Sequence, residues 1–560
     1  MLASPDRGPG VRLIRTAFLI SAIGMLALLH PPHAPAQETD YEEWLQKQQQ
    51  EYKQFLTEQD TAFLAFLKQD WTNVRVDTTA TTPIDDKPEQ TPRIEPFSSN
   101  RRSSPTADSA PSAPSPHSRQ PSSKPDAPSQ NGEEQTPGSR KEAMGQMDVA
   151  TDEQLPTETS PSPEPEQAPS YEQLPGESPP SPPAPGEKAR TATPTRDVPL
   201  SFFGISTTVP YGAALVPSLE GAPSKSSIRN FWKTMARSRY RPTLNVLQRQ
   251  REDIGLSDWG YYLYLKELGA KLYDDSSPNA QVLWTWFMMM KSGYAARVGY
   301  RQSKVFLMLP IAQKIYGRPQ MYYSGHRYYL MVEEMSGSLR TYEGQHGKAN
   351  QVLQLDEGSP PNVTERRMTR TVEFSFGDQR YALDLAYSPS TVEYLHAYPN
   401  VDLNVLMSTG VSSTAQSAFE ETLHPLVADR GPRASVNLLL TFTQFATNYK
   451  RDQDHFGEER YLFPEESLAS DYSDCEDRAI LLSYLVRTLL NREVVGLQWP
   501  RHVALAVRTG DGLTVADDDH TVTVNGDTYI FADPTYIGSH LGMEMPLVEG
   551  QSPEIIMLDE

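Results

Sequence analysis

One cysteine sits where a protein could use it as a nucleophile. Cys475 is the only cysteine among the 560 residues, and it opens a predicted helix with an apolar face through Leu490. The unpaired amides and the macrodipole of a first helical turn stabilise an anion such as a thiolate. Asp474, Glu476 and Asp477 oppose this effect. A partner imidazolium is therefore needed to lower the pKa of the thiol.

A histidine and an aspartate further along the chain could serve as the base and as the acid that orients it. His502 starts a predicted strand over residues 502–507. Asp533 ends a further predicted strand over 528–531. Such a carboxylate can accept from the imidazole and fix its tautomer. The order predicts a nucleophile, a base and an orienting acid. The alternative for Cys475 is a small buried apolar residue, since an exported chain with one cysteine has no internal disulfide.

These residues resemble the transglutaminase-like branch of the papain-fold superfamily over about residues 434–545. The family's cysteine opens a helix with an alanine and a leucine-rich face, as Cys475 does here. Its aspartate precedes Pro-Thr, which Asp533 matches fully. Its histidine precedes Ala-Trp, whereas the aromatic residue after His502 is missing. The resemblance implies a catalytic triad of Cys475, His502 and Asp533 in an α+β domain whose cysteine-bearing helix packs on an antiparallel sheet.

The acidic run around the cysteine also resembles bacterial transglutaminase-like periplasmic cysteine proteinases. By that resemblance Asp474 and Glu476 are candidate calcium ligands; the alternative is an acidic cap of the helix N-terminus. No cofactor is required for the chemistry. An oxyanion needs donors, for which the backbone N–H of Cys475 and the side chain of Gln444 are candidates. The alternative for Gln444 is an ordinary polar helix residue.

The chain begins with a predicted signal peptide over residues 1–36. Three arginines precede an apolar run at 16–29 that is short for a bilayer, and Ala34-Pro35-Ala36 is a small-residue cleavage site. No cysteine follows the run, which excludes a lipoprotein anchor. We expect a periplasmic or secreted protein without a membrane span after cleavage; the alternative is an uncleaved anchor.

Residues 37–72 carry an amphipathic helical pattern with a period of about 11 residues. The large residues of its stripe are Tyr41, Trp44, Leu45, Tyr52, Phe55, Leu56, Phe63, Phe66 and Leu67. Such a stripe must be buried, through self-association, on a partner or on the downstream domain. Residues 73–199 are rich in Pro, Ser and Thr and predict a disordered linker in which we place no site.

Two further domains are predicted at 200–350 and 360–560. The second is the transglutaminase-like domain, whose first part carries a hairpin around Gly377 and a candidate strand at 403–407. In the first, a buried helix runs into strands near 296–300, 305–309 and 327–332. Aligning the two puts Pro278 opposite Cys475 and Val305 opposite His502. The first would then be a degenerate copy without nucleophile or base; the alternative is a generic helix followed by strands.

The composition restricts the partners. A net charge of -21 excludes the basic character that nucleic-acid binding needs. The expected function is acyl transfer through a thioester, with hydrolysis of a protein or peptide substrate by a cysteine peptidase favoured. The alternatives are a crosslinking transglutaminase and a non-catalytic envelope scaffold or peptide-binding protein.

Overall fold

The computed structural model describes residues 60–77, 87–88, 90–94, 195–344, 349–356, 358–361 and 367–558. The predicted signal peptide, most of the aromatic helix and most of the linker lie outside these residues. The described part is a mixed α+β fold whose main sheets are antiparallel, as the sequence predicts.

None of the helices within the described ranges combines the length and the apolar character that a bilayer crossing requires.

The last part of the aromatic repeat packs on its own chain. Residues 60–66 are helical, and the ring of Phe63 lies 4.4 Å from that of Trp232. Strand β1 (Trp71–Val76) follows and pairs with a strand far along the chain. The structure thus differs from the predicted linker boundary at 73, because Trp71 and Val76 are buried at the two ends of this strand.

A hairpin and a group of helices precede the first large sheet. They are β2 (Thr195–Phe202), β3 (Ile205–Gly212), the 3-10 helix η1 (Ala213–Leu215), α2 (Lys225–Arg237), α3 (Tyr240–Ile254), α4 (Asp258–Leu272) and α5 (Pro278–Lys291). Ser224 caps α2 by accepting from the amide of Ser227. Helix α3 ends at Gly255, whose φ of 78° favours glycine. Pro278 is tolerated at the start of α5 because the amide there needs no partner.

The first sheet has the order β1-β8-β4-β5-β7-β6. Its strands are β4 (Arg297–Arg301), β5 (Lys304–Pro310), β6 (Gln320–Tyr323), β7 (His326–Leu330) and β8 (Gly337–Tyr342). Helix α5 packs on β5, which is buried over most of its length. The sequence predicted β4, β5 and β7, whereas the short strands β6 and β8 were not recognised.

The segment 367–474 is mostly helical. It contains β9 (Met368–Phe376), β10 (Gln379–Tyr387), α6 (Pro389–His396), α7 (Leu403–Ser408), α8 (Ser413–Thr422), α9 (His424–Ala428), α10 (Pro432–Ala446), β11 (Asn448–Tyr449), α11 (Asp452–His455), α12 (Pro464–Ala469) and β12 (Tyr472–Ser473). The predicted hairpin around Gly377 is confirmed. The predicted strand at 403–407 is wrong: this run is helix α7, and a short apolar run fits either element when it is buried on several sides.

The second sheet has the order β15-β16-β14-β13-β17. Helix α13 (Cys475–Leu490) precedes its strands and packs on β14. The strands are β13 (Val494–Trp499), β14 (His502–Arg508), β15 (Thr521–Val524), β16 (Asp527–Ala532) and β17 (Glu554–Ile556).

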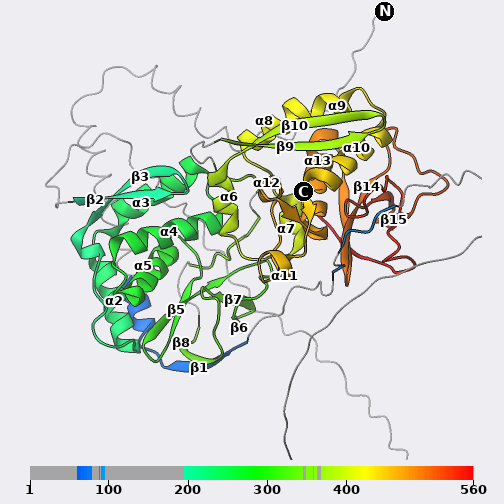
Figure 1. The fold of residues 1–560 in the computed structure, drawn as a ribbon. Coiled ribbons are helices and arrows are strands. Elements are labelled where there is room, and N and C mark those ends of the chain that lie inside the picture. The colour runs from blue at the N-terminus through cyan, green and yellow to red at the C-terminus, as the bar shows by residue number, and fades with distance from the viewer. Residues whose placement is uncertain are drawn as a thin grey trace, which may run out of the picture. The chain divides into compact units, whose positions relative to one another are not determined.

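The two sheets share one connectivity. In the first helix–sheet unit (α5 and β4–β8) the strand order is β8-β4-β5-β7-β6, and in the second (α13 and β13–β17) it is β17-β13-β14-β16-β15. Each unit therefore runs helix, hairpin, hairpin and return strand, with all pairs antiparallel. Figure 1 draws the first in green and the second in orange and red. Strand β1 is an additional edge strand beside β8.

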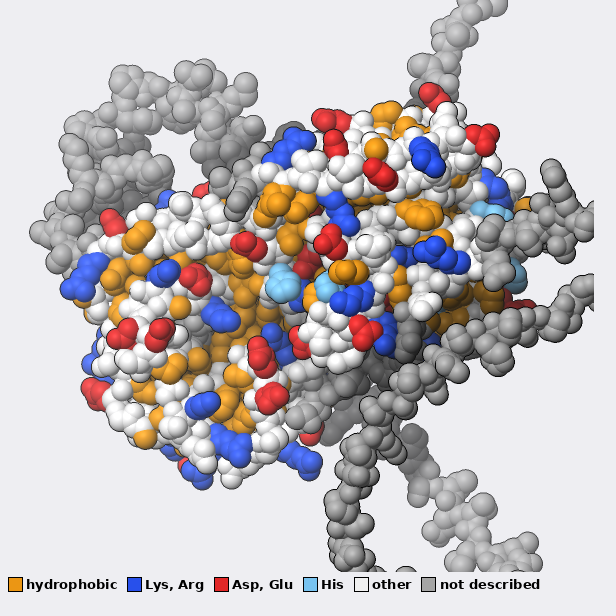
Figure 2. All heavy atoms as spheres, in the orientation of Figure 1, with side chains coloured by type: hydrophobic (Ala, Val, Ile, Leu, Met, Phe, Trp, Pro, Cys, Tyr) orange, Lys and Arg blue, Asp and Glu red, His pale blue; other side chains and the backbone are white. Residues whose placement is uncertain are grey.

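The outer surface of these elements is mixed in character. On the face drawn in Figure 2, acidic and basic side chains are interspersed, with hydrophobic side chains between them. One cluster of buried apolar side chains has members in both units, such as Trp286 of α5 and Leu485 of α13. The fold thus supports both units from a common core.

Candidate active site

The only cysteine is the first residue of α13, as the sequence predicts. Asp474 precedes it in extended conformation, and the amide of Asp474 donates to Asp477 Oδ2 at 3.3 Å. This is half of the reciprocal capping that fixes a helix start. Cys475 is 0 % exposed. Its thiol is therefore buried within the described fold.

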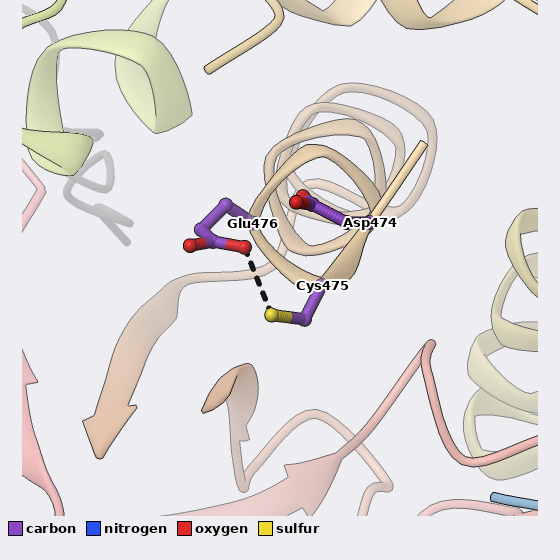
Figure 3. A group of neighbouring side chains, drawn as sticks. All are labelled: Asp474, Cys475 and Glu476. Atoms are coloured by element: carbon purple, nitrogen blue, oxygen red, sulfur yellow. Dashed lines mark hydrogen bonds between the residues drawn. The ribbon is translucent and has the colours of Figure 1, made fainter. Parts of the chain in front are cut away.

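The thiol of Cys475 is held by a neighbouring carboxylate. Its Sγ donates to Glu476 Oε2 at 2.8 Å (Figure 3). Burial raises the pKa of Cys475 well above its ordinary value, and the charges of Glu476 and Asp474 raise it further. In this arrangement the helix N-terminus does not produce the thiolate that we expected it to favour. The described state holds a neutral thiol.

The predicted base and the predicted orienting acid meet. His502 Nε2 lies 2.7 Å from Asp533 Oδ2, and both side chains are buried. The other oxygen of Asp533 accepts from the amides of Thr535 and Tyr536 at 2.8 and 3.2 Å. This leaves His502 Nδ1, which is buried and has no hydrogen-bond partner among the described residues. The hydrogen bonds of those residues do not include one between Cys475 and His502.

The start of β14 and the end of β13 set the orientation of the imidazole. His502 pairs with Trp499 in the β13–β14 hairpin, and their rings stack with centroids 5.9 Å apart. The pairing follows from the tight turn at residues 500–501. Since Nε2 is engaged by Asp533, Nδ1 is the nitrogen that could take a proton from a nucleophile.

Gln444 has a different place from the one proposed for an oxyanion donor. Its Nε2 donates to the backbone oxygens of Tyr536 and Ser539, each at 3.1 Å. Its Oε1 accepts from the amide of Gly538 at 3.1 Å. Gln444 therefore holds the loop after Asp533 and is a positioning residue in this arrangement. The backbone N–H of Cys475 stays the candidate donor.

A lysine from the predicted linker reaches the acidic residues at the helix start. Lys87 Nζ lies 2.6 Å from Asp474 Oδ2 and 2.9 Å from Glu476 Oε1. It also pairs with Glu459 and lies 3.7 Å from Asp452 Oδ2. We call these four acidic residues with Lys87 the ammonium pocket. No site was predicted in this stretch, since a Lys-Pro pair in a proline-rich segment carries no signal.

The ionisable groups of the ammonium pocket shift one another's pKa values. Burial and the neighbouring carboxylates, mainly Glu476, raise the pKa of Asp474 to about 7. Burial likewise raises the pKa of Asp452 and of Asp477. Burial alone would lower the pKa of Lys87, but the surrounding carboxylates outweigh it and raise that pKa. The lysine is therefore held as an ammonium.

The carboxylates proposed as calcium ligands are the ones that bind this lysine. The ligand atoms of Asp474, Cys475 and Glu476 lie within 4.8 Å of one another. Calcium prefers six to eight oxygen ligands, and a thiol is not one of them. In the described arrangement Asp474 and Glu476 pair with Lys87. The carboxylates of Asp452, Asp474 and Asp477 also lie within 4.8 Å of one another, and calcium binding here stays a prediction.

An arginine supports the helix start from the other side. Arg478 Nε donates to Ser473 Oγ at 3.2 Å, and its Nη2 donates to the backbone oxygen of Thr447 at 3.0 Å. Burial lowers the pKa of Arg478 to about 10. The guanidinium ties α13 to β12 and to Thr447, the residue before β11, and β11 and β12 pair in parallel. This fixes where Cys475 lies.

The first unit has a hollow at the place that corresponds to the triad. Arg301 pairs with Lys304 as Trp499 pairs with His502, so Lys304 has the hairpin position of His502. The sequence alignment had put Val305 there, one residue away. A hollow of about 450 Å³ is lined by Pro278, Asn279, Val282, Lys304, Val305, Phe306, Val332, Glu333 and Glu334. These include the helix start, the hairpin and the residues after β7.

A larger hollow is not part of the triad. It measures about 660 Å³ and is lined by residues from the end of α13 and the start of β13, with Arg487, Arg492 and Arg508 among them. Arg487 and Arg492 donate to backbone oxygens, and Arg508 pairs with Glu493. The three arginine side chains thus already have partners within the fold.

Comparisons with protein-family models, with curated proteins and with solved structures found no match. The function of this site is therefore inferred from its own residues.

Proposed function

We propose that residues 360–560 form a transglutaminase-like thiol enzyme that transfers acyl groups through a thioester on Cys475. The observation that carries the proposal is the buried pair of His502 and Asp533, 2.7 Å apart, with Nδ1 of the imidazole unpartnered among the described residues. A histidine with one nitrogen fixed by a carboxylate and the other open is arranged to act as a base. The helix that begins with Cys475 packs on the strand that begins with His502.

The reaction follows from these roles. The sulfur of Cys475 bonds to an amide carbonyl carbon while its proton passes to His502 Nδ1. Collapse of the tetrahedral intermediate breaks the C–N bond, and His502 returns the proton to the leaving amine. A water molecule, deprotonated by the same nitrogen, then attacks the thioester and releases a carboxylic acid and the free thiol. Asp533 keeps the ring oriented and stabilises the imidazolium.

The acceptor distinguishes two versions of the proposal. Water gives a cysteine peptidase acting on protein or peptide amides, which we favour for a chain with a predicted export signal and a periplasmic or secreted destination. An amine gives an isopeptide bond and a crosslinking transglutaminase. Both use the same Cys475 thioester, so they differ only in the second half of the reaction.

The described arrangement corresponds to a resting state in this proposal. Cys475 is buried and donates to Glu476. Before attack, Sγ has to leave Glu476 and meet His502 Nδ1, because the raised pKa of the thiol in its present surroundings disfavours the thiolate. The same burial favours the rival function, a peptide-binding domain that performs no chemistry.

The first helix–sheet unit fits the proposal as a degenerate copy. It shares the connectivity of the second unit, but it has Pro278 at its helix start and Lys304 at the hairpin position of His502. Met331 and Val332 follow its strand β7 where Asp533 follows β16. Pro278, at the helix position of Cys475, has no nucleophilic side chain, so the role of this unit would be support or binding.

The test is acylation of the full chain with p-nitrophenyl acetate. A burst of nitrophenol and an acetyl group on Cys475, located by mass spectrometry, are expected. The reaction should be faster in Ile94→Asp. This substitution weakens the contact of residues 90–94 with the loop that follows Asp533. An adduct in neither protein contradicts the proposal. On natural protein substrates, new chain termini would identify a peptidase, and new isopeptide bonds would identify a transglutaminase.

A further inference from the structure

A short part of the N-terminal stretch lies along the loop that follows Asp533. The amide of Ile94 donates to the backbone oxygen of Ile537 at 3.1 Å, and the amide of Ile537 donates to that of Pro92 at 3.0 Å. Arg93 and Ile537 form a parallel bridge. These are the main-chain bonds by which an extended peptide adds to a protein edge. Residues 90–94 therefore contact the second unit as a bound peptide would.

The same segment is held again a few residues earlier. Tyr449 Oη donates to the backbone oxygen of Pro88 at 2.9 Å, and Lys87 enters the ammonium pocket. Main-chain bonds combined with one side-chain pocket are the usual elements of peptide recognition. Residues 87–88 and 90–94 thus show both.

The ammonium pocket is built for a cation. The side chains of Asp474 and Glu476 are 0 % exposed, and that of Lys87 is 4 % exposed. Buried carboxylates are stable only when a counter-charge and hydrogen bonds compensate for the lost hydration. Asp474 Oδ1 and Asp452 Oδ1 have no hydrogen-bond partner within the described ranges, so acceptor capacity is left in the pocket. Among the described residues, Lys87 Nζ supplies the positive charge at 2.6 Å from Asp474 and 2.9 Å from Glu476.

The charges of the pocket also determine the protonation state of an amine that is bound there. The carboxylates raise the pKa of Lys87, so its nitrogen carries three protons and has no lone pair for attack on a thioester. An amine bound there is recognised as an ammonium and is not the acyl acceptor. The pocket is therefore a specificity element beside the thiol, which Glu476 links to it through its two oxygens.

We propose that the ammonium pocket recognises a lysine-class side chain of an extended peptide substrate, and that Lys87, with the neighbouring described residues 88 and 90–94, occupies this subsite as an internal ligand. The inference rests on the proposed function, since the substrate would run past the same thiol. It adds the class of side chain that the enzyme selects.

The test is peptide binding by the full chain with its internal ligand weakened. The probe is a fluorescein-labelled peptide with the sequence of residues 85–95, and its matched control has norleucine in place of the lysine. Binding to Lys87→Met is measured by fluorescence anisotropy, after circular dichroism has shown that the variant folds. A buried charged hydrogen bond supports a preference for the lysine peptide of about 10- to 100-fold.

A second variant covers a failure of the first to fold. Ile94→Asp keeps the ammonium pocket and Lys87 but weakens the strand-like contact, and it should show the same preference. Equal binding of both peptides, or binding of neither, overturns the inference. If the variants prefer the lysine peptide but Cys475 cannot be acylated, the lysine subsite is supported and the proposed enzyme is refuted. If Cys475 is acylated but the lysine peptide is not preferred, the enzyme is supported and the lysine subsite is refuted.

Discussion

The first helix–sheet unit begins its helix with Pro278, and the second begins its helix with Cys475. Both helices lead into a hairpin with a tight turn, which carries Lys304 in one unit and His502 in the other. The strand order is the same, so the path of the chain does not depend on the residues that could do chemistry. This framework is therefore specified by its buried faces.

The glycines of the two hairpins illustrate what the framework does require. A Cβ on Gly299 would lie 2.4 Å from Leu339 Cδ1 and 3.0 Å from the backbone oxygen of Arg340. A Cβ on Gly496 would lie 2.9 Å from Ile556 Cβ. In both units the return strand approaches the first strand of the hairpin too closely for a side chain. This feature is shared, whereas Cys475, His502 and Asp533 belong to the second unit.

The largest expected effect separates the two hairpin positions. In the Ile94→Asp background, His502→Ala should slow acylation of Cys475 by p-nitrophenyl acetate by about 10²- to 10⁴-fold, because a positioned base is lost. Lys304→Ala, the matched change in the first unit, should leave the rate unchanged. Stopped-flow measurement of the nitrophenol burst tests both. Equal losses in the two variants would remove the functional difference between the units.

The buried lysine should contribute far more stability than its exposed counterpart. Lys87→Met leaves buried carboxylates without their counter-charge and should cost about 3–5 kcal/mol. Lys304→Met, at an exposed position of the first unit, should change the free energy of unfolding by less than about 0.5 kcal/mol. Urea denaturation followed by tryptophan fluorescence measures both. If Lys87→Met leaves the free energy of unfolding unchanged, the pocket is hydrated.

Substitution of the two hairpin glycines should affect both units alike. Gly299→Ala and Gly496→Ala each force a Cβ into occupied space and should cost about 1–3 kcal/mol. Gly212→Ala is the control, since a Cβ there meets nothing within 4 Å. Thermal unfolding reports the three values. If only one of the hairpin variants is destabilised, the packing of the two units is not equivalent.

The smallest expected effect is a dependence of stability on pH that originates in the second unit. The folded state raises the pKa of Asp474 from 3.8 to about 7, so the folded chain holds a proton that the unfolded chain releases. This contribution is complete below about pH 3.8 and is lost as the pH rises through about 7. Between pH 6 and 7 stability should fall by on the order of 1 kcal/mol, somewhat less than the value of one full pKa unit because the group is only half deprotonated at pH 7.

The control for this dependence is Asp474→Asn, which removes the titrating group. Denaturation curves at several pH values should show a flatter profile for the variant than for the natural chain. A rise of stability with pH over the same range would contradict the assignment of the proton to this pocket.

The sequence predicted the elements of the site better than its contacts. Helix periodicity and alternation located α13, β14 and β16, and the pair of His502 and Asp533 followed from their places at strand ends. Lys87 could not be found in this way, because its partner Asp474 is 387 residues away and the segment around it has no periodicity. Gln444 was misjudged since its type gives no information on which loop its amide will bind. The run at 403–407 was ambiguous between strand and helix until its neighbours were known.

We propose that Cys475 and His502 form a reactive pair, which residues 87–88 and 90–94 hold in a resting state. The rate of Cys475 alkylation by iodoacetamide, measured against pH, tests it most directly. We expect slow alkylation in the natural chain. In Ile94→Asp we expect a fast reaction with a thiol pKa below the ordinary value of about 8.5, lost on adding His502→Ala. A thiol that titrates at or above that value in Ile94→Asp, with no effect of His502→Ala, would contradict the account.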